Sequence, residues 1–587
     1  MANRELAKIF NEIALYFEMD GAPFKPQAYE KAAINLETLS EDVKDIYKKG
    51  GREALEEIPG VGKNIADKVI EYIKVGRIKE YEKLKKKTPV SIDELISVEG
   101  IGPKGVSYLY KKLKIKNLKD LERAAKAGKI RNLPNFGKKK EQNILEGIEF
   151  VKRSKGRFLL GEILPKVQEI ISELKKLKEI KQISEAGSVR RRKETIGDVD
   201  ILITSPNPKK VIDYFTVMPG VVKIWGKGPT KASVRLSVGV GIDVDLRVLP
   251  NSQFGSALQY FTGSKEHNII LRKIAIDKGL KLNEYGLFRG PKMIAGRTEK
   301  EVYAALKMDY IEPELRENQG EIEAALRQAR GKPNGLPKII GYKDILGDLH
   351  CHSNWDGGNN SIEEMAKTAQ KMGYQYIGIA DHTKFLRIEN GLNEKQLIER
   401  NKEIDKINKK FQASGSKFQV LKGCEANIMA DGSIDIDDKV LAQMDFVIAG
   451  VHSQMKMLKV QMTKRIIRAM KNPNVDIISH PTGRILKKRD EYEIDFDELL
   501  KIAKETGTIL EINAFPVRLD LNDVHIKKAK QAGVKMVINT DAHKKEHLRF
   551  IEYGISQARR GWAEKRDVIN TFSVDKLLNS LKSSNKS

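Results

Sequence analysis

The segment GDLHCHSNWDGG, residues 347–358, concentrates side chains that bind metals. His350 and His352 flank Cys351, so on a β-strand the two imidazoles share one face and the thiol points to the other. A zinc finger instead spaces its cysteines as CxxC, a pattern that this segment lacks. The spacing therefore predicts a metal site that uses both imidazoles and excludes Cys351.

Further candidate ligands follow at the ends of apolar, strand-like runs downstream. They are Asp356, His382, Glu425, His452, His480, Asp541 and His543. A mixture of imidazole and carboxylate ligands suits Mn²⁺, Zn²⁺ or iron. A lone histidine is usually structural, but this many at strand ends in one region favour a shared metal centre.

A second group of candidate catalytic residues lies in AGSVRRRKETIGDVDIL, residues 186–202. Asp198 and Asp200 are two positions apart on an expected strand, so their carboxylates face the same way and repel unless cations hold them. GIDVDLRVLP supplies another pair, Asp243 and Asp245. Carboxylates on neighbouring strands can hold two Mg²⁺ ions about 3.5–4 Å apart for in-line phosphoryl transfer. Spacing alone does not choose between Asp243 and Asp245.

Phosphate-binding groups accompany the first carboxylate pair. Gly187 and Ser188 offer N–H and hydroxyl donors, and the run Arg190, Arg191 and Arg192 offers forked hydrogen bonds to a triphosphate. A single DxD pair is common on surface strands. The combination with the second pair favours a nucleotidyl-transfer site.

The elements that must position these residues differ along the chain. Residues 1–150 predict short helices joined by glycine turns, and residues 151–315 mix helices with strands such as VDILIT. Residues 316–340 start as a polar helix and end rich in Gly and Pro, which predicts a linker. From residue 345, apolar strands alternate with helices and carry polar residues at their C-terminal ends, as in an α/β barrel.

Three turns in the first part share an apolar residue, a tight glycine turn, a cation and a helix start, and they resemble helix-hairpin-helix motifs. Backbone N–H groups and a helix start at such a turn suit a DNA phosphate without reading bases. The candidate DNA-binding residues are Gly60, Gly62, Lys63, Gly100, Gly102, Lys104, Gly137 and Lys138. The third turn has Asn135 where glycine is expected, which weakens its predicted phosphate binding.

Composition supports a polyanion partner. The 587 residues carry a net charge of +26, and residues 101–200 alone hold 26 basic and 13 acidic residues. The alternative is a lysine-rich surface adapted to growth temperature. Two cysteines, an N-terminal segment without a signal-peptide core and the lack of an apolar run near ~18 residues predict a cytoplasmic protein outside the membrane.

The motifs GSxRRxxxxxGDxD, DLRVLP, QYFTGSKEHN and LNEYGLF resemble family X DNA polymerases over residues 1 to 315. This resemblance implies that Asp198, Asp200 and Asp245 bind Mg²⁺ or Mn²⁺ and are catalytic. It implies nucleotide binding by Gly187, Ser188, Arg191, Gly197, Tyr260, Phe261, Gly263, Asn268 and Arg272. The first helices also resemble the polymerase beta N-terminal domain, where a lysine at the place of Lys68 forms a lyase Schiff base. An ordinary phosphate-contacting surface lysine is the alternative for Lys68.

The second region resembles the PHP (polymerase and histidinol phosphatase) domain, with HxH, DH, GCE, VHS, SHP and DAH in order. That resemblance implies a metal-dependent phosphoesterase with up to three Mn²⁺ or Zn²⁺ ions. The implied ligand sets are His350, His352, Glu425 and Asp541; Glu425, His452 and His480; and Asp356, His382 and His543.

With its polymerase-like part and its PHP-like part together, the chain resembles prokaryotic PolX enzymes. This resemblance implies a monomeric gap-filling DNA polymerase of base-excision repair, with gapped or primed DNA and dNTPs as substrates and a PHP 3′–5′ exonuclease. The alternatives are a DNA-binding scaffold with a single active site and a small-molecule phosphatase. The expected fold is a multidomain α+β and α/β chain with helix-hairpin-helix domains, a palm, a thumb and a distorted α/β barrel.

We expect seven parts along the chain. They are an N-terminal lyase-like helical domain (1–85), a helix-hairpin-helix fingers-type domain (86–150), the palm (151–240), the end of the palm with the thumb (241–315), a linker (316–344), the PHP barrel (345–575) and a tail (576–587).

Overall fold

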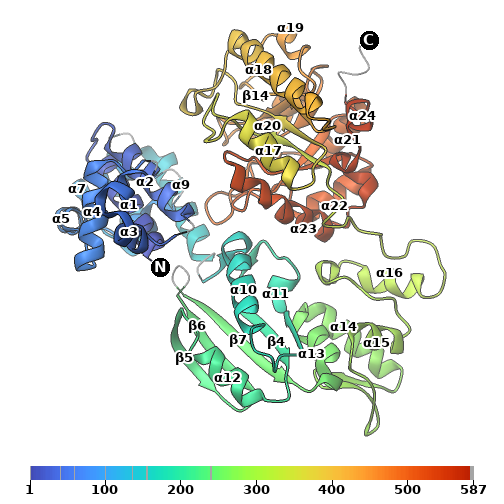
Figure 1. Cartoon of the computed structure of the whole chain (residues 1–587). Helices are drawn as coiled ribbons and strands as arrows, with labels where there is room; N and C mark the ends of the chain where they lie inside the picture. The colour runs from blue at the N-terminus through green and yellow to red at the C-terminus, as the bar shows by residue number, and fades with distance from the viewer. Residues whose placement is uncertain are drawn as a thin grey trace. The chain divides into compact units, whose positions relative to one another are not determined.

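The computed structural model describes residues 2–39, 41–58, 60–98, 101–134, 136–153, 156–237 and 241–581. Two compact units divide the chain, one of residues 1–155 with 487–489 and one of the remainder. The first unit contains α1 (Ala2–Met19), α2 (Lys25–Thr38), α3 (Val43–Glu56), α4 (Lys63–Val75), α5 (Lys79–Lys87), α6 (Ile92–Ile96), α7 (Pro103–Leu113), α8 (Leu118–Lys126) and α9 (Gly137–Arg153). These helices are the blue and cyan ribbons of Figure 1.

Amphipathic spacing explains this helical unit. In α1 the side chains of Leu6, Phe10, Ile13 and Phe17 recur every three or four residues and are buried together in one apolar cluster. A second cluster joins α6 to α9. Each cluster leaves the glycine turns and the polar helix faces at the surface.

The second unit begins with the palm. It contains β1 (Phe158–Leu159), α10 (Leu160–Leu174), β2 (Gln182–Glu185), α11 (Gly187–Arg190), β3 (Thr195–Ile196), β4 (Val199–Thr204), α12 (Pro208–Thr216), β5 (Val221–Lys227), β6 (Lys231–Leu236) and β7 (Ile242–Leu249). Five strands form one sheet in the order β2-β4-β7-β6-β5, in which only β4 and β7 are parallel. Figure 1 shows this sheet in green.

Strand alternation separates the two faces of the palm sheet. Val199, Ile201 and Ile203 of β4 pack into the cluster that α10 and α12 cover. The residues between them, including Asp200, point to the opposite face. The same alternation in β7 places Asp243 and Asp245 on that opposite face.

The thumb follows, with α13 (Phe254–Thr262), α14 (Lys265–Asp277), β8 (Lys281–Asn283), β9 (Gly286–Arg289), β10 (Lys292–Ala295), α15 (Glu299–Ala305) and η2 (Pro313–Leu315). Part of the expected linker packs against the thumb. It contains α16 (Glu321–Gln328), whose Ile322 and Ala325 are buried in the thumb cluster. The buried Glu321 also lies 2.7 Å from His267 Nδ1, which fixes the start of this helix to α14.

The last part alternates strands and helices. Its elements are β11 (Gly347–Cys351), α17 (Ile362–Lys371), β12 (Tyr376–Ile379), α18 (Glu394–Ala413), β13 (Gln419–Lys422), β14 (Glu425–Asn427), α19 (Asp438–Leu441), β15 (Ile448–Gly450), α20 (Lys459–Met470), β16 (Ile477–Ile478), α21 (Phe496–Thr506), β17 (Ile509–Asn513), α22 (Asp523–Ala532), β18 (Met536–Asn539), α23 (Ile551–Arg560) and α24 (Val574–Leu578). All strand pairs between β11 and β13 and between β14 and β18 are parallel.

Two parallel bridges connect the two sheets into a distorted barrel. His382, after β12, pairs with Glu425 of β14, and Cys351 of β11 pairs with Ala542, after β18. The strands' carboxyl ends therefore meet at one rim, where an α/β barrel carries its active site. This confirms the expected fold class.

Candidate functional sites

The palm carboxylates converge on two adjacent parallel strands. Asp200 of β4 and Asp245 of β7 are direct register partners. The sequence pattern predicts Asp198 within this strand, but in the structure Asp198 directly precedes β4. Burial, followed by the charges of Asp198 and Asp245, raises the pKa of Asp200 to about 6. This mutual repulsion is the electrostatic condition that divalent cations relieve, so the three carboxylates fit a metal pair.

Gly187 is required beside these carboxylates. It has φ +60°, and a Cβ atom there would lie 2.9 Å from Asp200 Oδ2. Its neighbour Ser188 lies in the short helix α11, and Gly197 directly precedes Asp198. The chain therefore brings Gly187 directly against the carboxylate of Asp200.

The second DxD pair divides between two roles. Asp243 accepts from Arg235 Nε and Nη2, both at 2.8 Å, and from Trp225 Nε1 at 2.8 Å. Asp245 lies 2.9 Å from Lys231 Nζ and beside Asp200. The fold thus separates the two carboxylates that spacing could not distinguish, and Asp245 is the one in the cluster.

The three arginines of the run 190–192 have different partners. Arg190 binds Glu299 of α15 through two bonds of 2.9 and 2.6 Å, and Arg192 lies 3.5 Å from Glu185. Arg191 donates from Nε to Glu317 at 3.0 Å and from Nη1 to the carbonyl of Thr262. Of the three arginines that could bond to a triphosphate, Arg190 thus has its guanidinium in an ion pair with the buried Glu299.

The aromatic pair expected at the nucleotide sugar lies at the end of α13. The rings of Tyr260 and Phe261 are 5.2 Å apart and nearly perpendicular, and Gly263 caps the helix with φ +70°. Asn268 donates to the carbonyl of Tyr260 at 2.7 Å, which fixes it against this turn. Arg272 is exposed one helical turn further along α14.

The described residues of the glycine turns in the helical unit lie at helix starts. Gly60 has φ +79°, and a Cβ atom there would lie 2.9 Å from Lys31 Cγ. Lys63, Lys104 and Lys138 are exposed in the first turns of α4, α7 and α9, where no acidic residue occurs. Gly62 and Gly102 are the N-cap residues, and Gly137 begins α9. Gly100 and Asn135 lie outside the described residues.

The side chain of Lys68 forms an ion pair with Glu80. Its Nζ lies 2.7 Å from Glu80 Oε2, and Tyr29 donates its hydroxyl to the same oxygen at 2.7 Å. Its side chain is 20% exposed. A Schiff base needs the unprotonated amine, so any lyase chemistry at Lys68 requires this pair to open.

The barrel histidines gather around two carboxylates. Glu425 lies 3.2 Å from His350 Nε2, 2.9 Å from His382 Nδ1 and 3.1 Å from His480 Nε2. It also lies 3.2 Å from His452 Nε2. His352 Nε2 and His350 Nε2 lie 3.3 and 3.8 Å from Asp541 Oδ1. Cys351 is instead buried in the apolar cluster behind the strand, as alternation predicts.

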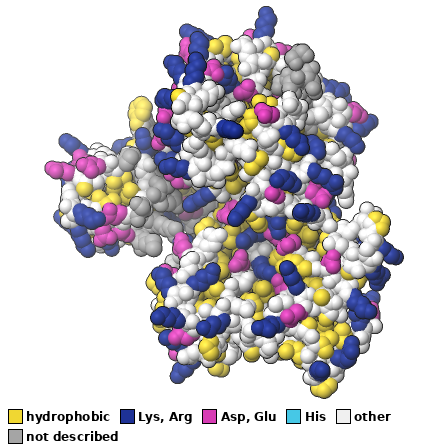
Figure 2. All heavy atoms as spheres, turned by 45° about the vertical axis from the view of Figure 1, so that its right-hand side comes forward, with side chains coloured by type: hydrophobic (Ala, Val, Ile, Leu, Met, Phe, Trp, Pro, Cys, Tyr) yellow, Lys and Arg dark blue, Asp and Glu magenta, His cyan; other side chains and the backbone are white. Residues whose placement is uncertain are grey.

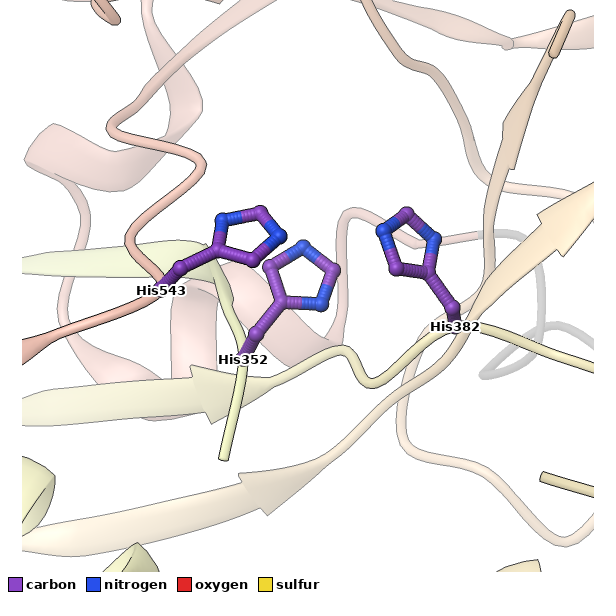
Figure 3. Close-up of side chains that lie close together, drawn as sticks. All are labelled: His352, His382 and His543. Carbon is purple, nitrogen blue, oxygen red and sulfur yellow. The ribbon is translucent and has the colours of Figure 1, made fainter. Parts of the chain in front are cut away.

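Four sets of described side chains place possible ligand atoms within 4.8 Å of one another. They are His350, His352 and Asp541; His382, Glu425 and His452; His352, His382 and His543; and His352, Asp356 and Asp381. Figure 3 shows the third set, with the ring of His352 between those of His543 and His382. Here His352 joins His382 and His543 in place of the expected Asp356.

Buried nitrogens without partners test whether this cluster fits a metal. His350 Nε2 and His352 Nε2 are buried and make no hydrogen bond to described residues. Their other ring nitrogens lie 2.7 Å from Glu511 Oε1 and Asp356 Oδ2. A carboxylate on the outer nitrogen of a ligating histidine is the usual support of a metal site, so the residues fit metal ions.

The electrostatics of Glu425 and His480 support the same conclusion. Burial raises the pKa of Glu425, but the facing histidines outweigh it and hold this pKa well below the ordinary value. Burial, followed by Arg518, lowers the pKa of His480 to about 4. The first group is thus a carboxylate and the second a neutral imidazole, which are the forms that bind metals.

Three residues of this site were not foreseen. Glu511 supports His350, Asp381 is paired with Arg400 at 3.1 Å, and Arg518 lies 3.5 Å from Asp541. The signal for Glu511 was an acidic residue inside the apolar strand TILEIN. Arg518 follows a loop whose course depends on tertiary contacts, and no local pattern marked it.

Charged side chains are dispersed over the face that Figure 2 shows. Figure 2 shows Lys and Arg side chains over the whole visible face, interspersed with Asp and Glu. Local geometry, such as the helix starts above, must therefore select a phosphate. Among the described helices, none combines the length and the apolar character of a membrane span.

Family models match five segments of the chain. They are a helix-hairpin-helix domain at residues 1–78, a SAM-like helix-hairpin-helix tandem at 92–149, a DNA polymerase beta palm at 161–227, a DNA polymerase beta thumb at 257–317 and a PHP domain at 348–515.

Whole proteins match as well. The DNA polymerase/3′-5′ exonuclease PolX of Bacillus subtilis is 37% identical over 577 residues, which are 98% of each chain. A probable phosphatase of Thermoanaerobacter is 31% identical over 239 residues, 38% of this chain and 89% of the relative. The first match spans both sites and every part between them. The chain therefore belongs to the prokaryotic family X DNA polymerases that carry a C-terminal PHP domain.

Proposed function

We propose that this protein is a DNA-directed DNA polymerase that fills short gaps and a 3′–5′ exonuclease that degrades DNA at a separate site. The register pairing of Asp200 with Asp245 carries the proposal, because it builds a three-carboxylate cluster beside a phosphate-sized turn. The PolX relative, named for both activities, supports it. We further place the enzyme in base-excision repair in the cytoplasm, acting as a monomer.

In the polymerase site, Asp198, Asp200 and Asp245 would hold Mg²⁺ or Mn²⁺, which supplies charge neutralisation to the reacting phosphates. Ser188 and Arg191 bind the triphosphate, with Gly187 and Gly197 giving the backbone room to approach. A further set shapes the pocket for the sugar and the nascent base pair, and comprises Tyr260, Phe261, Gly263, Asn268 and Arg272.

In the barrel, the histidine and carboxylate cluster would hold Mn²⁺ or Zn²⁺ ions, which supply Lewis-acid chemistry for phosphodiester cleavage. The ligands are His350, His352, Asp356, His382, Glu425, His452, His480, Asp541 and His543. Asp356 also orients His352 through Nδ1. Arg518, 3.5 Å from Asp541, is placed to bind a phosphate oxygen of the DNA.

In the helical unit, the turns before α4, α7 and α9 bind phosphates of the duplex. The proposed contacts are Gly60, Gly62, Lys63, Gly100, Gly102, Lys104, Gly137 and Lys138. Sequence-independent contacts of this kind suit an enzyme that must act at any gap. Lys68 is kept as a candidate lyase residue that must first leave Glu80.

A second function is favoured by relatives named probable phosphatases, which cover 38% and 34% of this chain. In that case the barrel hydrolyses a small phosphomonoester. A 5′-labelled primer in a gapped duplex separates the functions: extension with dNTPs and Mg²⁺, and shortening with Mn²⁺ alone, are expected. If the primer is neither extended nor shortened and phosphate is released from a small phosphomonoester, the phosphatase function is favoured and the proposal is contradicted.

A further inference from the structure

The loop that carries Arg191 is contacted by the PHP part of the same compact unit. Arg560, at the end of α23, donates from Nη1 to the carbonyl of Arg191 at 2.8 Å. Gln557, one turn earlier, lies 3.4 Å from the carbonyl of Arg192. The backbone of the arginine run is therefore held from a helix that lies far away in the sequence.

Side chains of the same loop are held from the barrel too. Arg484, after β16, donates to Glu194 at 2.7 Å. The side chains of Arg484 and Arg560 are 8% and 3% exposed. Water competes little for the hydrogen bonds of buried guanidinium groups, so these contacts constrain the loop.

Glu317 joins Arg191 to Arg560 directly. Its Oε1 accepts from Arg191 Nε at 3.0 Å and from Arg560 Nη1 at 3.0 Å, and its Oε2 lies 3.7 Å from Lys193. Arg560 also donates from Nη2 to Asp523 of α22. Burial raises the pKa of Glu317, but Arg560, Arg191 and Lys193 outweigh it and keep the group ionised.

These bonds determine the direction of the Arg191 guanidinium. Nε is fixed by Glu317 and Nη1 by the carbonyl of Thr262. Among the described residues, no acceptor bonds to Nη2. The orientation thus leaves Nη2 for a phosphate oxygen, and it depends on Glu317 remaining where Arg560 holds it.

We propose that Arg560 and Glu317 are positioning residues of the polymerase, through which the PHP part orients Arg191 for the nucleotide triphosphate. This inference rests on the proposed role of Arg191 in triphosphate binding. The PHP part then contributes to nucleotide affinity independently of its own metal cluster. A small misplacement of a phosphate-binding group is enough to weaken binding strongly.

The competing explanation is that Arg560 only holds the two parts of the unit together. Arg559 provides the matched control, because it is the preceding residue of the same helix. It donates to Glu314 at 2.7 Å and to the carbonyl of Ile340 at 2.8 Å, and its guanidinium lies 5.0 Å from the Tyr342 ring centroid. Within the described part of the chain, Arg559 makes no hydrogen bond or ion pair to Arg191, to its loop or to Glu317.

The test is steady-state gap filling, with KM for the incoming dNTP and kcat measured for Arg560→Gln, Glu317→Gln, Arg559→Gln and Arg191→Ala in the full chain. Arg560→Gln and Glu317→Gln should raise KM about tenfold with kcat within about twofold. Arg559→Gln should leave KM unchanged even where its melting temperature falls as much as that of Arg560→Gln. Arg560→Lys, which keeps the charge, should recover part of the affinity.

A double-mutant cycle isolates the link through Arg191. Because Arg560 acts through that side chain, Arg191→Ala/Arg560→Gln should have the KM of Arg191→Ala alone. Additive effects would overturn the inference, as would equal KM values for Arg559→Gln and Arg560→Gln. If Arg191→Ala itself leaves KM unchanged, the proposed triphosphate role fails instead, so the two failures are distinguishable.

Discussion

Asp200 and Asp245 are neighbours across parallel strands β4 and β7, although 45 positions separate them in the chain. Parallel pairing places both carboxylates on the sheet face that α10 and α12 leave uncovered. Asp198 joins them from the residue before β4. The site is thus built by one register, and a slip of either strand by one residue would turn the carboxylate of that strand into the apolar core.

The first prediction separates the two aspartates of β7. Asp245→Asn should lower nucleotide incorporation more than about 100-fold, because it removes a carboxylate from the metal cluster. Asp243→Asn is the control, since Asp243 is bound by Arg235 and Trp225 instead. It should retain incorporation within about threefold. Single-nucleotide gap filling measures both, and equal losses would show that the structure assigns the wrong aspartate.

The second prediction concerns Glu511, which contacts His350 Nδ1 and accepts a hydrogen bond from the backbone N–H of His480. Glu511→Gln should weaken Mn²⁺ binding to the barrel about 10- to 100-fold, because it removes the charge that orients the imidazole. Calorimetric titration of Mn²⁺ and primer shortening should change together. Gap filling should stay within about twofold. Unaltered Mn²⁺ affinity would mean that His350 is not a ligand through Nε2.

The third prediction tests the phosphate turns. Lys63→Gln should reduce the steepness with which affinity for gapped DNA falls with salt, by about 0.9 in the log–log slope for one lost phosphate contact. Lys74→Gln, at the other end of α4, removes the same charge without touching the turn. Fluorescence anisotropy across a salt series measures both slopes. Identical slopes for the two variants would remove the turn before α4 from the DNA interface.

The fourth prediction concerns Lys68. Borohydride reduction with a 5′-deoxyribose-phosphate duplex should trap a covalent adduct that Lys68→Ala loses. Glu80→Gln should increase trapping, because the carboxylate that holds the ammonium is gone. A wild-type protein that yields no adduct would leave Lys68 as an ion-paired structural residue.

Local periodicity predicted much of both sites. Alternation placed His350 and His352 on one face and Cys351 on the other, and the structure confirms it. Alternation also gave Asp243 and Asp245 the same face, which is why it could not choose between them. The choice depends on Arg235 of β6 and Trp225 of β5, which both bond to Asp243.

Long-range ion pairs account for what the sequence did not predict. Arg190 and Arg191 are adjacent and chemically equal in the sequence, but of these two described residues only Arg190 bonds to Glu299, which lies 109 positions from it. The expected linker contains a helix fixed to the thumb because Glu321 reaches His267. No local pattern specifies such partners.

The central claim is that one chain holds two independent active sites, and paired activities of His352→Ala test it most directly. Primer shortening without dNTPs and gap filling with dNTPs are measured on the same labelled duplex, with Cys351→Ser as the control for the strand itself. His352→Ala should lose shortening by more than about 100-fold and retain gap filling within about twofold, and Cys351→Ser should keep both. Persistent shortening by His352→Ala, or a parallel loss of gap filling, would contradict the account.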